Sequence, residues 1–142
     1  MASKTDNGNF HTLLTDIYQA VLDMDCRPES LILPHTTNPN RTVFPYMEVA
    51  FAGTSNRQTR QTGSSLVRFL IQIDIVAQNR SKSAELNEYI QEIWKCFPPY
   101  RLLGSGDYKA QVLELPRLDP FEATPKGNYR VPITIIFSTT VK

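Results

Sequence analysis

The segment that decides the fold is Leu66–Val76, with the sequence LVRFLIQIDIV. Every second position of this segment is apolar, and these positions are Val67, Phe69, Ile71, Ile73 and Ile75. Successive side chains of a strand point to opposite faces, so the alternation predicts a β-strand with one apolar face. The opposite face mixes polar residues with Leu66, Leu70 and Val76. A strand that is apolar on both faces is often covered on both, so we expect a neighbouring subunit to cover this second face.

Five other segments show the periodicity of helices or strands. Helices are predicted from Phe10 to a point before Pro28, and from Ser81 or Ser83 to about Phe97. Further strands are predicted at Val43–Phe51, Ala110–Leu115 and Tyr129–Ser138, where Ile136 lies on the outward side. The resulting order is α-β-β-α-β-β, an α+β fold with one mainly antiparallel or mixed sheet. Both helices are expected on one face, because their apolar stripes need the same apolar surface to cover. Pro132, inside the last strand, predicts an edge or a bulge.

The chain of 142 residues has the size of one domain, and its 41% hydrophobic and 20% charged residues are ordinary globular values. We therefore predict a single domain over residues 10–142, preceded by a flexible polar terminus at 1–9. No apolar run is long enough for a membrane helix, and no signal peptide is expected. The net charge of +1 gives no general attraction to nucleic acid.

The stretch Gly53–Ser65 contains no acidic residue and no large apolar one. It predicts a hairpin with an unusually long, flexible loop that carries Arg57 and Arg60. Such a loop is either simply solvated or orders against a partner. Specific nucleic-acid binding is disfavoured, because aromatic residues that could stack on bases are not interleaved with these arginines.

No group of residues predicts catalysis or metal binding. His11 and His35 have no carboxylate or cysteine at ligand spacing, and Cys26 and Cys96 form no CxxC pair. The Gly104-x-Gly106 pair lacks the further glycine and the Lys-Ser/Thr of a phosphate-binding loop. The sequence therefore predicts a protein that is not an enzyme, with no catalytic, cofactor or metal residues.

Four segments, taken in order, resemble the tail terminator (tail completion, minor tail protein) family of long-tailed phages. They are the helix FHTLLTDIYQAVLDMD, the proline-bearing strand VFPYMEVAFAG, the strand and helix SLVRFLIQIDIVAQNRSKSAELNEYIQEIWKCFPP, and the closing strands AQVLEL and GNYRVPITIIFS. Together they cover the chain from about Phe10 to Val141. The likeness lies in the pattern of elements and not in an invariant motif.

The resemblance implies a structural virion protein that caps the tail tube as a hexameric ring. Such a ring ends tube polymerisation and forms the joint to the head, so its partners are other copies of itself, the tail tube protein and a head-completion or neck protein. It is assembled in the host cytoplasm and resides at the head–tail junction. The resemblance assigns Arg57, Arg60 and Arg68 to ring or tube contacts, and the apolar outer face adds Leu70 and Ile136.

Two alternatives remain open. The chain could be another head–tail connector or neck ring subunit, or a small module that binds a peptide or ligand through a sheet edge or its loops. Mixing with tail tube protein separates terminator from connector. A concave apolar pocket with converging polar groups would favour a binding module.

Overall fold

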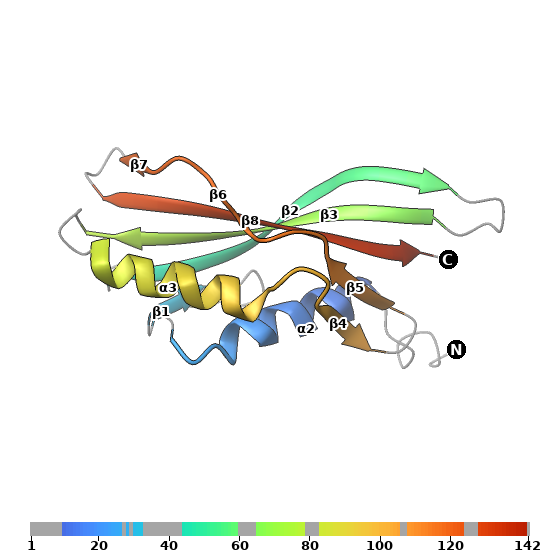
Figure 1. The fold of residues 1–142 in the computed structure, drawn as a ribbon, viewed down its shortest axis with the longest axis horizontal. Helices are drawn as coiled ribbons and strands as arrows, with labels where there is room; N and C mark the ends of the chain where they lie inside the picture. Colours follow the sequence, from blue (N-terminus) through green and yellow to red (C-terminus); the bar gives the residue numbers. More distant parts are fainter. Residues whose placement is uncertain are drawn as a thin grey trace.

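The structure is a computed structural model that describes residues 10–26, 28, 30–32, 44–59, 65–78, 83–105, 108–123 and 128–141 (Figure 1). The predicted flexible terminus at 1–9 lies outside these residues. The helices are α2 (Phe10–Leu22) and α3 (Ser83–Cys96). The strands are β1 (Ser30–Ile32), β2 (Tyr46–Thr59), β3 (Ser65–Ala77), β4 (Leu102–Ser105), β5 (Tyr108–Val112), β6 (Arg117–Leu118), β7 (Glu122–Ala123) and β8 (Tyr129–Val141).

All eight strands join one sheet, in the order β1-β2-β3-β8-β5-β4, with β6 and β7 also paired to β8. The pair β1–β2 is parallel and every other pair is antiparallel. The centre of the sheet is β3–β8, which stays in register from Ser65↔Val141 to Ala77↔Tyr129. The predicted α+β class with a mixed sheet is therefore confirmed. The element order is richer than predicted, because β1, β4, β6 and β7 were not expected.

The predicted long loop at Gly53–Ser65 is wrong. The strand β2 continues to Thr59, which pairs with Ser65, so only residues 60–64 separate the two arms of the hairpin. Backbone hydrogen bonds can hold a strand whatever its side chains are. The prediction failed because the residues of this arm are polar and show no hydrophobic alternation. The pairing shifts between Phe51 and Thr54 and again between Thr54 and Asn56. Gly53 has a φ of +96°, a conformation that suits a glycine in such a bulge.

Both helices lie on the same side of the sheet in Figure 1. They bury their apolar stripes against the inward residues of β3 and β8. The buried residues of both helices and of these strands belong to one continuous core. The fully buried side chains of this core include Leu13, Ile17, Phe69, Ile71, Ile73, Ile75, Ile93, Phe97, Ile133, Ile135 and Phe137. The alternation that predicted the inner face of β3 is the one that the helices cover.

The strands β5, β6 and β7 act as one broken strand beside β8. Pairing runs from Ala110↔Thr139 through Arg117↔Thr134 to Ala123↔Tyr129, with irregular steps between the three pieces. Pro132 lies within β8 at the second step, where its carbonyl accepts a hydrogen bond from the Asp119 amide at 3.0 Å. Pro132 has no N–H to return this bond, and the pairing of β6 with β8 ends next to it.

Candidate interaction surfaces

The face of the sheet opposite the helices carries an aliphatic row, which we name the outer row. Leu70 of β3 and Ile136 of β8 are direct cross-strand partners, and both side chains are half-buried. The amide of Leu113 donates to the carbonyl of Ile136 at 3.0 Å, which places Leu113 next in line and also half-buried. Directly opposed side chains lie on one face and about 5 Å apart. Leu70, Ile136 and Leu113 therefore form a short apolar row across three strands.

The structure brings together three of the five predicted interface residues. Arg68 is exposed and precedes Leu70 by two positions, so both lie on the outer face of β3, as does Ile136 on β8. Arg57 lies within β2 and its backbone pairs with Val67, while Arg60 lies outside the described residues. The arginines were predicted on a loop, whereas Arg57 sits on a strand. The assignment of these residues to an interface stays a prediction.

Beside the outer row this face carries a polar network, and beyond the network Tyr46 and Val76 form a small buried apolar cluster with Phe44. Arg130 forms an ion pair with Asp74 at 3.0 Å, and the Gln72 side-chain amide donates to the same carboxylate at 2.9 Å. Thr134 donates to Asp119 at 2.9 Å. Among the described residues, every buried side-chain nitrogen or oxygen has a hydrogen-bond partner. Groups that are mutually satisfied in this way stabilise the fold.

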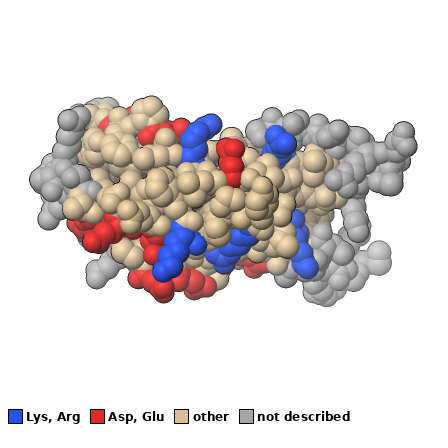
Figure 2. Space-filling model, viewed as in Figure 1, with Lys and Arg blue, Asp and Glu red and all other residues tan. Residues whose placement is uncertain are grey.

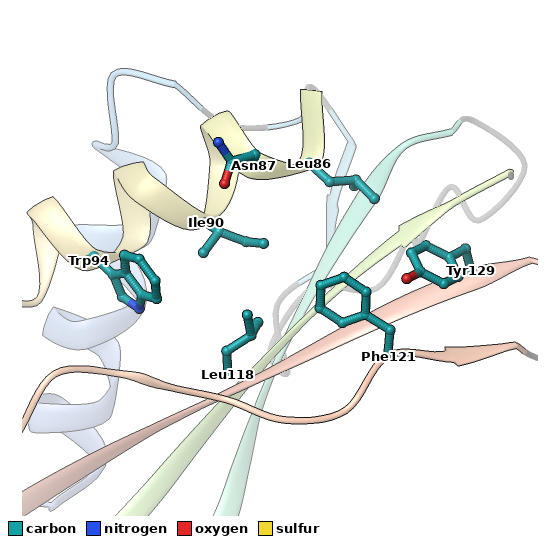
Figure 3. Close-up of a pocket in the computed structure, with 7 residues that line it drawn as sticks. All are labelled: Leu86, Asn87, Ile90, Trp94, Leu118, Phe121 and Tyr129. Atoms are coloured by element: carbon teal, nitrogen blue, oxygen red, sulfur yellow. The ribbon is translucent and has the colours of Figure 1, made fainter. Parts of the chain in front are cut away.

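An apolar pocket of about 190 Å³ opens between α3 and the broken strand (Figure 3). It is lined by Leu86, Asn87, Ile90, Trp94, Leu118, Phe121 and Tyr129. The indole N–H of Trp94 donates to the Pro116 carbonyl at 2.9 Å, and the rings of Phe121 and Tyr129 meet edge to face with centroids 5.3 Å apart. These contacts fix the aromatic walls in place. We name this site the α3 pocket.

Little in the sequence pointed to the α3 pocket. One wall comes from a helix whose apolar stripe was predicted, but the other comes mainly from residues 117–123, where no helix or strand was predicted. Leu118 and Phe121 are 37% and 45% exposed, so they are large apolar side chains that the fold leaves partly in water. Leu118 and Phe121 lie three positions apart with Pro120 between them, so no strand alternation joins them, and only the pairing of β6 and β7 with β8 reveals their position.

A second apolar feature is the turn after α3, where Tyr100 is 72% exposed and Leu102 is 62% exposed. We name these two residues the exposed turn. Tyr100 has a φ of 72°, which is unusual for a bulky residue. Its amide donates to the Val112 carbonyl at 2.7 Å, and the Val112 amide donates to the Arg101 backbone carbonyl at 2.9 Å. The backbone is thus fixed to β5 while the tyrosine ring points away from the core.

Both cysteines are free thiols. Burial raises the pKa of Cys96, and the neighbouring Arg101 guanidinium offsets this only in part. Desolvation also raises the pKa of Cys26, with further contributions from the nearby carboxylates of Glu88, Glu92 and Glu85. A raised thiol pKa leaves little thiolate at neutral pH. Neither cysteine is therefore prepared to act as a nucleophile.

Within the described part of the chain, no three His, Cys, Asp or Glu side chains gather in a group that could hold a metal ion. Neither described helix is long and apolar enough to cross a membrane.

Comparison with known proteins adds information on the fold alone. No family model matches the sequence, and no curated protein matches it. A solved structure whose name describes no activity is similar, with a TM-score of 0.66 over 93% of this chain and 96% of that chain. Its sequence identity is 16%, so the two share an architecture, and nothing about activity follows from the likeness.

Proposed function

We propose that this protein is a structural subunit that assembles as a closed ring on the end of a phage tail tube, as a tail terminator of the virion. In this role it ends tube polymerisation and presents a surface to a head-completion or neck protein. The proposal rests on the resemblance of the sequence to that family. Among structural observations the outer row supports it best, since an aliphatic row on a sheet face without a helix of its own is available for a partner to cover.

The geometry supports a protein that acts through its surfaces. The buried polar side-chain atoms of the described residues all have hydrogen-bond partners, and both thiols have raised pKa values. The apolar features on the surface lie in separate places: the outer row, the α3 pocket and the exposed turn. A ring built from heterologous contacts uses a different patch for giving and for receiving, so several distinct patches on one subunit suit such an assembly.

The ring proposal is tested by the mass of the protein and by its effect on tubes. We expect light scattering and negative-stain images across a concentration series to show closed rings of about six subunits, formed alone or on tube ends. Added to polymerising tail tube protein, the protein should shorten the tubes and decorate one end. Failure both to form rings and to bind tube ends would overturn the proposal.

The outer row is tested with Leu70→Ser and Ile136→Ser, because a half-buried aliphatic exchanged for a small polar residue leaves the inner core intact. Thr15→Ser, on the exposed side of α2, is the control for an unrelated surface change. If the variants lose ring mass, the row lies between ring subunits. If the variants still form rings of the wild-type mass but no longer bind tube ends, the row faces the tube. Folded variants that behave as the wild type in both assays would exclude the row from assembly.

The α3 pocket favours a second candidate, a small module that binds a peptide or ligand. Its walls are apolar and aromatic, with the Asn87 amide at the rim, as in many ligand pockets. Its volume of about 190 Å³ fits one large side chain more readily than a whole small molecule. A fragment screen by NMR that places ligands in this pocket, in a protein that forms no ring and binds no tube end, would favour this candidate.

A further inference from the structure

The outer row continues, toward the hairpin end of the sheet, into a part of the outer face that carries two cations. Arg68 of β3, Ser138 of β8 and Gln111 of β5 are cross-strand neighbours, one step from the outer row. Arg68 lies two positions before Leu70, and Lys109 lies two positions before Gln111, so both cations lie on the outer face. Both cationic side chains are exposed. We name the outer row together with Arg68, Ser138, Gln111 and Lys109 the hairpin-end face.

The strands of the hairpin-end face carry no acidic residue beside these cations. The sequence from Val49 to Ile73 has no Asp or Glu, and neither has the end of β8 from Ile133 to Val141. Glu114 lies in the bend that follows β5, and Asp107 lies outside the described residues. Asp74 lies on the other side of the outer row, where the polar network holds its carboxylate. In Figure 2 the acidic side chains lie mainly in the left half of the view, whereas Figure 1 shows the hairpin end at the right. The hairpin-end face therefore has a local excess of positive charge.

We propose that the hairpin-end face binds an extended acidic segment of a partner protein. In an extended segment, an apolar and an acidic side chain two positions apart point to the same side and stand about 7 Å from each other. Leu70 and Arg68 have the same spacing on β3, so one segment can place its apolar group on the outer row and its carboxylate on the Arg68 guanidinium. Lys109 provides a second cation on β5. The apolar and the charged contacts together set the orientation of the bound segment.

The chemistry of the hairpin-end face favours a protein over other partners. The face consists of aliphatic, hydroxyl, amide and cationic side chains, so it has no aromatic ring on which a base could stack. Its apolar part is the single outer row, which is much smaller than the apolar face of a helix that lies on a membrane. A second copy related by a two-fold axis would bring Arg68 and Lys109 of both copies together, and like charges disfavour such a pair. In the proposed function the partner is the tail tube or neck protein, and only this identification rests on that proposal.

The test uses a short synthetic peptide in which leucine and glutamate stand two positions apart with serine between them. A matched peptide carries lysine in place of glutamate. In an NMR titration of the wild type, the acidic peptide should shift the methyl signals of Leu70, Leu113 and Ile136, with a Kd below about 1 mM. The lysine peptide should bind about fivefold or more weakly, because it meets cations of its own sign. Methyl signals that stay in place with the acidic peptide would overturn the proposal.

Charge reversal gives the decisive comparison. Arg68→Glu and Lys109→Glu should each weaken binding of the acidic peptide about fivefold, and the double variant should prefer the lysine peptide. The matched control is Lys95→Glu, the same change at an exposed lysine at the end of α3, and it should leave both affinities as in the wild type. Leu70→Ser should weaken both peptides alike, because it removes an apolar contact and no charge. Circular dichroism checks that each variant folds. A folded double variant that still prefers the acidic peptide would exclude this face as the site.

Other partners would give different results in the same titration. If a short oligothymidylate or vesicles of phosphatidylcholine and phosphatidylserine shift these methyl signals and the acidic peptide does not, the face binds phosphate groups and the proposal is wrong. If the protein ignores the peptide but loses self-association in the double variant, the face contacts other copies of this chain and the proposal is again wrong.

The peptide assay needs neither a ring nor a tail tube, so it fails independently of the proposed function. A protein that binds the acidic peptide through this face and forms no ring keeps the inference and loses the ring. Rings that ignore the acidic peptide keep the ring proposal and overturn the inference.

Discussion

The two faces of the β3–β8 pair come from alternate residues of the same two segments, yet they are buried in different ways. On the inner face Ile71, Ile73, Ile133 and Ile135 are fully buried beneath the helices. The outer face buries polar residues through mutual bonds, as with Asp74, which is 8% exposed, and leaves the aliphatic outer row half-open. The inner face is completed by this chain, whereas the outer row has no helix of its own.

The difference shows what a β-alternation specifies. Period two assigns each residue to a face, and a uniformly apolar face must be covered for the chain to fold. A mixed face has no such requirement, because water or a partner can cover it. The comparison therefore separates residues that serve folding from residues that are free to serve assembly.

The largest expected effect comes from two neighbouring isoleucines on opposite faces of β8. Ile135→Ala should lower the free energy of unfolding by about 3–4 kcal/mol, because it leaves a cavity in a fully buried core. Ile136→Ala should cost about 1 kcal/mol in the monomer, since its side chain is only half-buried. Urea unfolding at low protein concentration measures both values. Equal losses would break the comparison, because the outer face would then be as tightly covered as the inner one.

The inner face was predictable from the sequence because a strong periodicity marks both of its strands. The helices were predictable for the same reason, as α2 begins at Phe10 and α3 ends one residue before Phe97. The apolar stripe of each helix must be buried, and the apolar side of the sheet is the surface that can bury it.

The short and polar strands were not predictable. The extension of β2 to Thr59 carries no apolar pattern, and β6 and β7 have two residues each, held only by pairing with β8. The α3 pocket depends on these strands, so it could not be predicted either. Among the predicted interface residues, Leu70 and Ile136 were placed on one face by period alone, but their direct pairing depends on the register of β3 and β8.

A second contrast concerns two glycines with a similar positive φ, one beside α2 and one on the open β2–β3 hairpin. Gly104 has a φ of +104°, and an added Cβ would clash with the Tyr108 carbonyl and lie 2.8 Å from the Leu13 side chain of α2. Gly53 has a φ of +96° and open space around it. We expect Gly104→Ala to lose about 2–3 kcal/mol, and Gly53→Ala about 1 kcal/mol from strain alone. Thermal unfolding measures the difference. Equal losses would mean that α2 does not press on the β4–β5 hairpin.

The polar part of the outer face offers a contrast between two arginines. Arg130→Ala should cost about 1–2 kcal/mol, because it leaves the nearly buried Asp74 carboxylate without its ion pair. Arg68→Ala should cost less than about 0.5 kcal/mol, since Arg68 is exposed. A double variant with Asp74→Asn isolates the coupling between the pair. If Arg68→Ala were the costlier change in the monomer, the outer face would be held by charges other than the Asp74 network.

The smallest expected effect is a loss of stability in alkaline solution, and it arises on the helix side of the sheet. Burial raises the pKa of Tyr18, Tyr89 and Cys96, desolvation raises that of Cys26, and the Glu85 carboxylate adds to the rise for Tyr89 by accepting its hydroxyl at 2.8 Å. Each group holds its proton more tightly in the folded chain than in the unfolded one. Its contribution is complete below the ordinary values of 9.0 for the thiols and 10.0 for the tyrosines, and is lost as pH rises through the higher folded pKa.

The unfolding temperature should therefore fall as the pH rises above about 9, first through the thiols and above about pH 10 also through the tyrosines, and Tyr89→Phe should flatten the later part of this fall because it removes one of the four groups. Calorimetry in matched buffers measures how steeply the unfolding temperature falls with pH in the wild type and in the variant. Cys96→Ala is a second test and should also flatten the fall. A stability that rises across this range would mean that these four groups are better solvated than the packing of α2 and α3 implies.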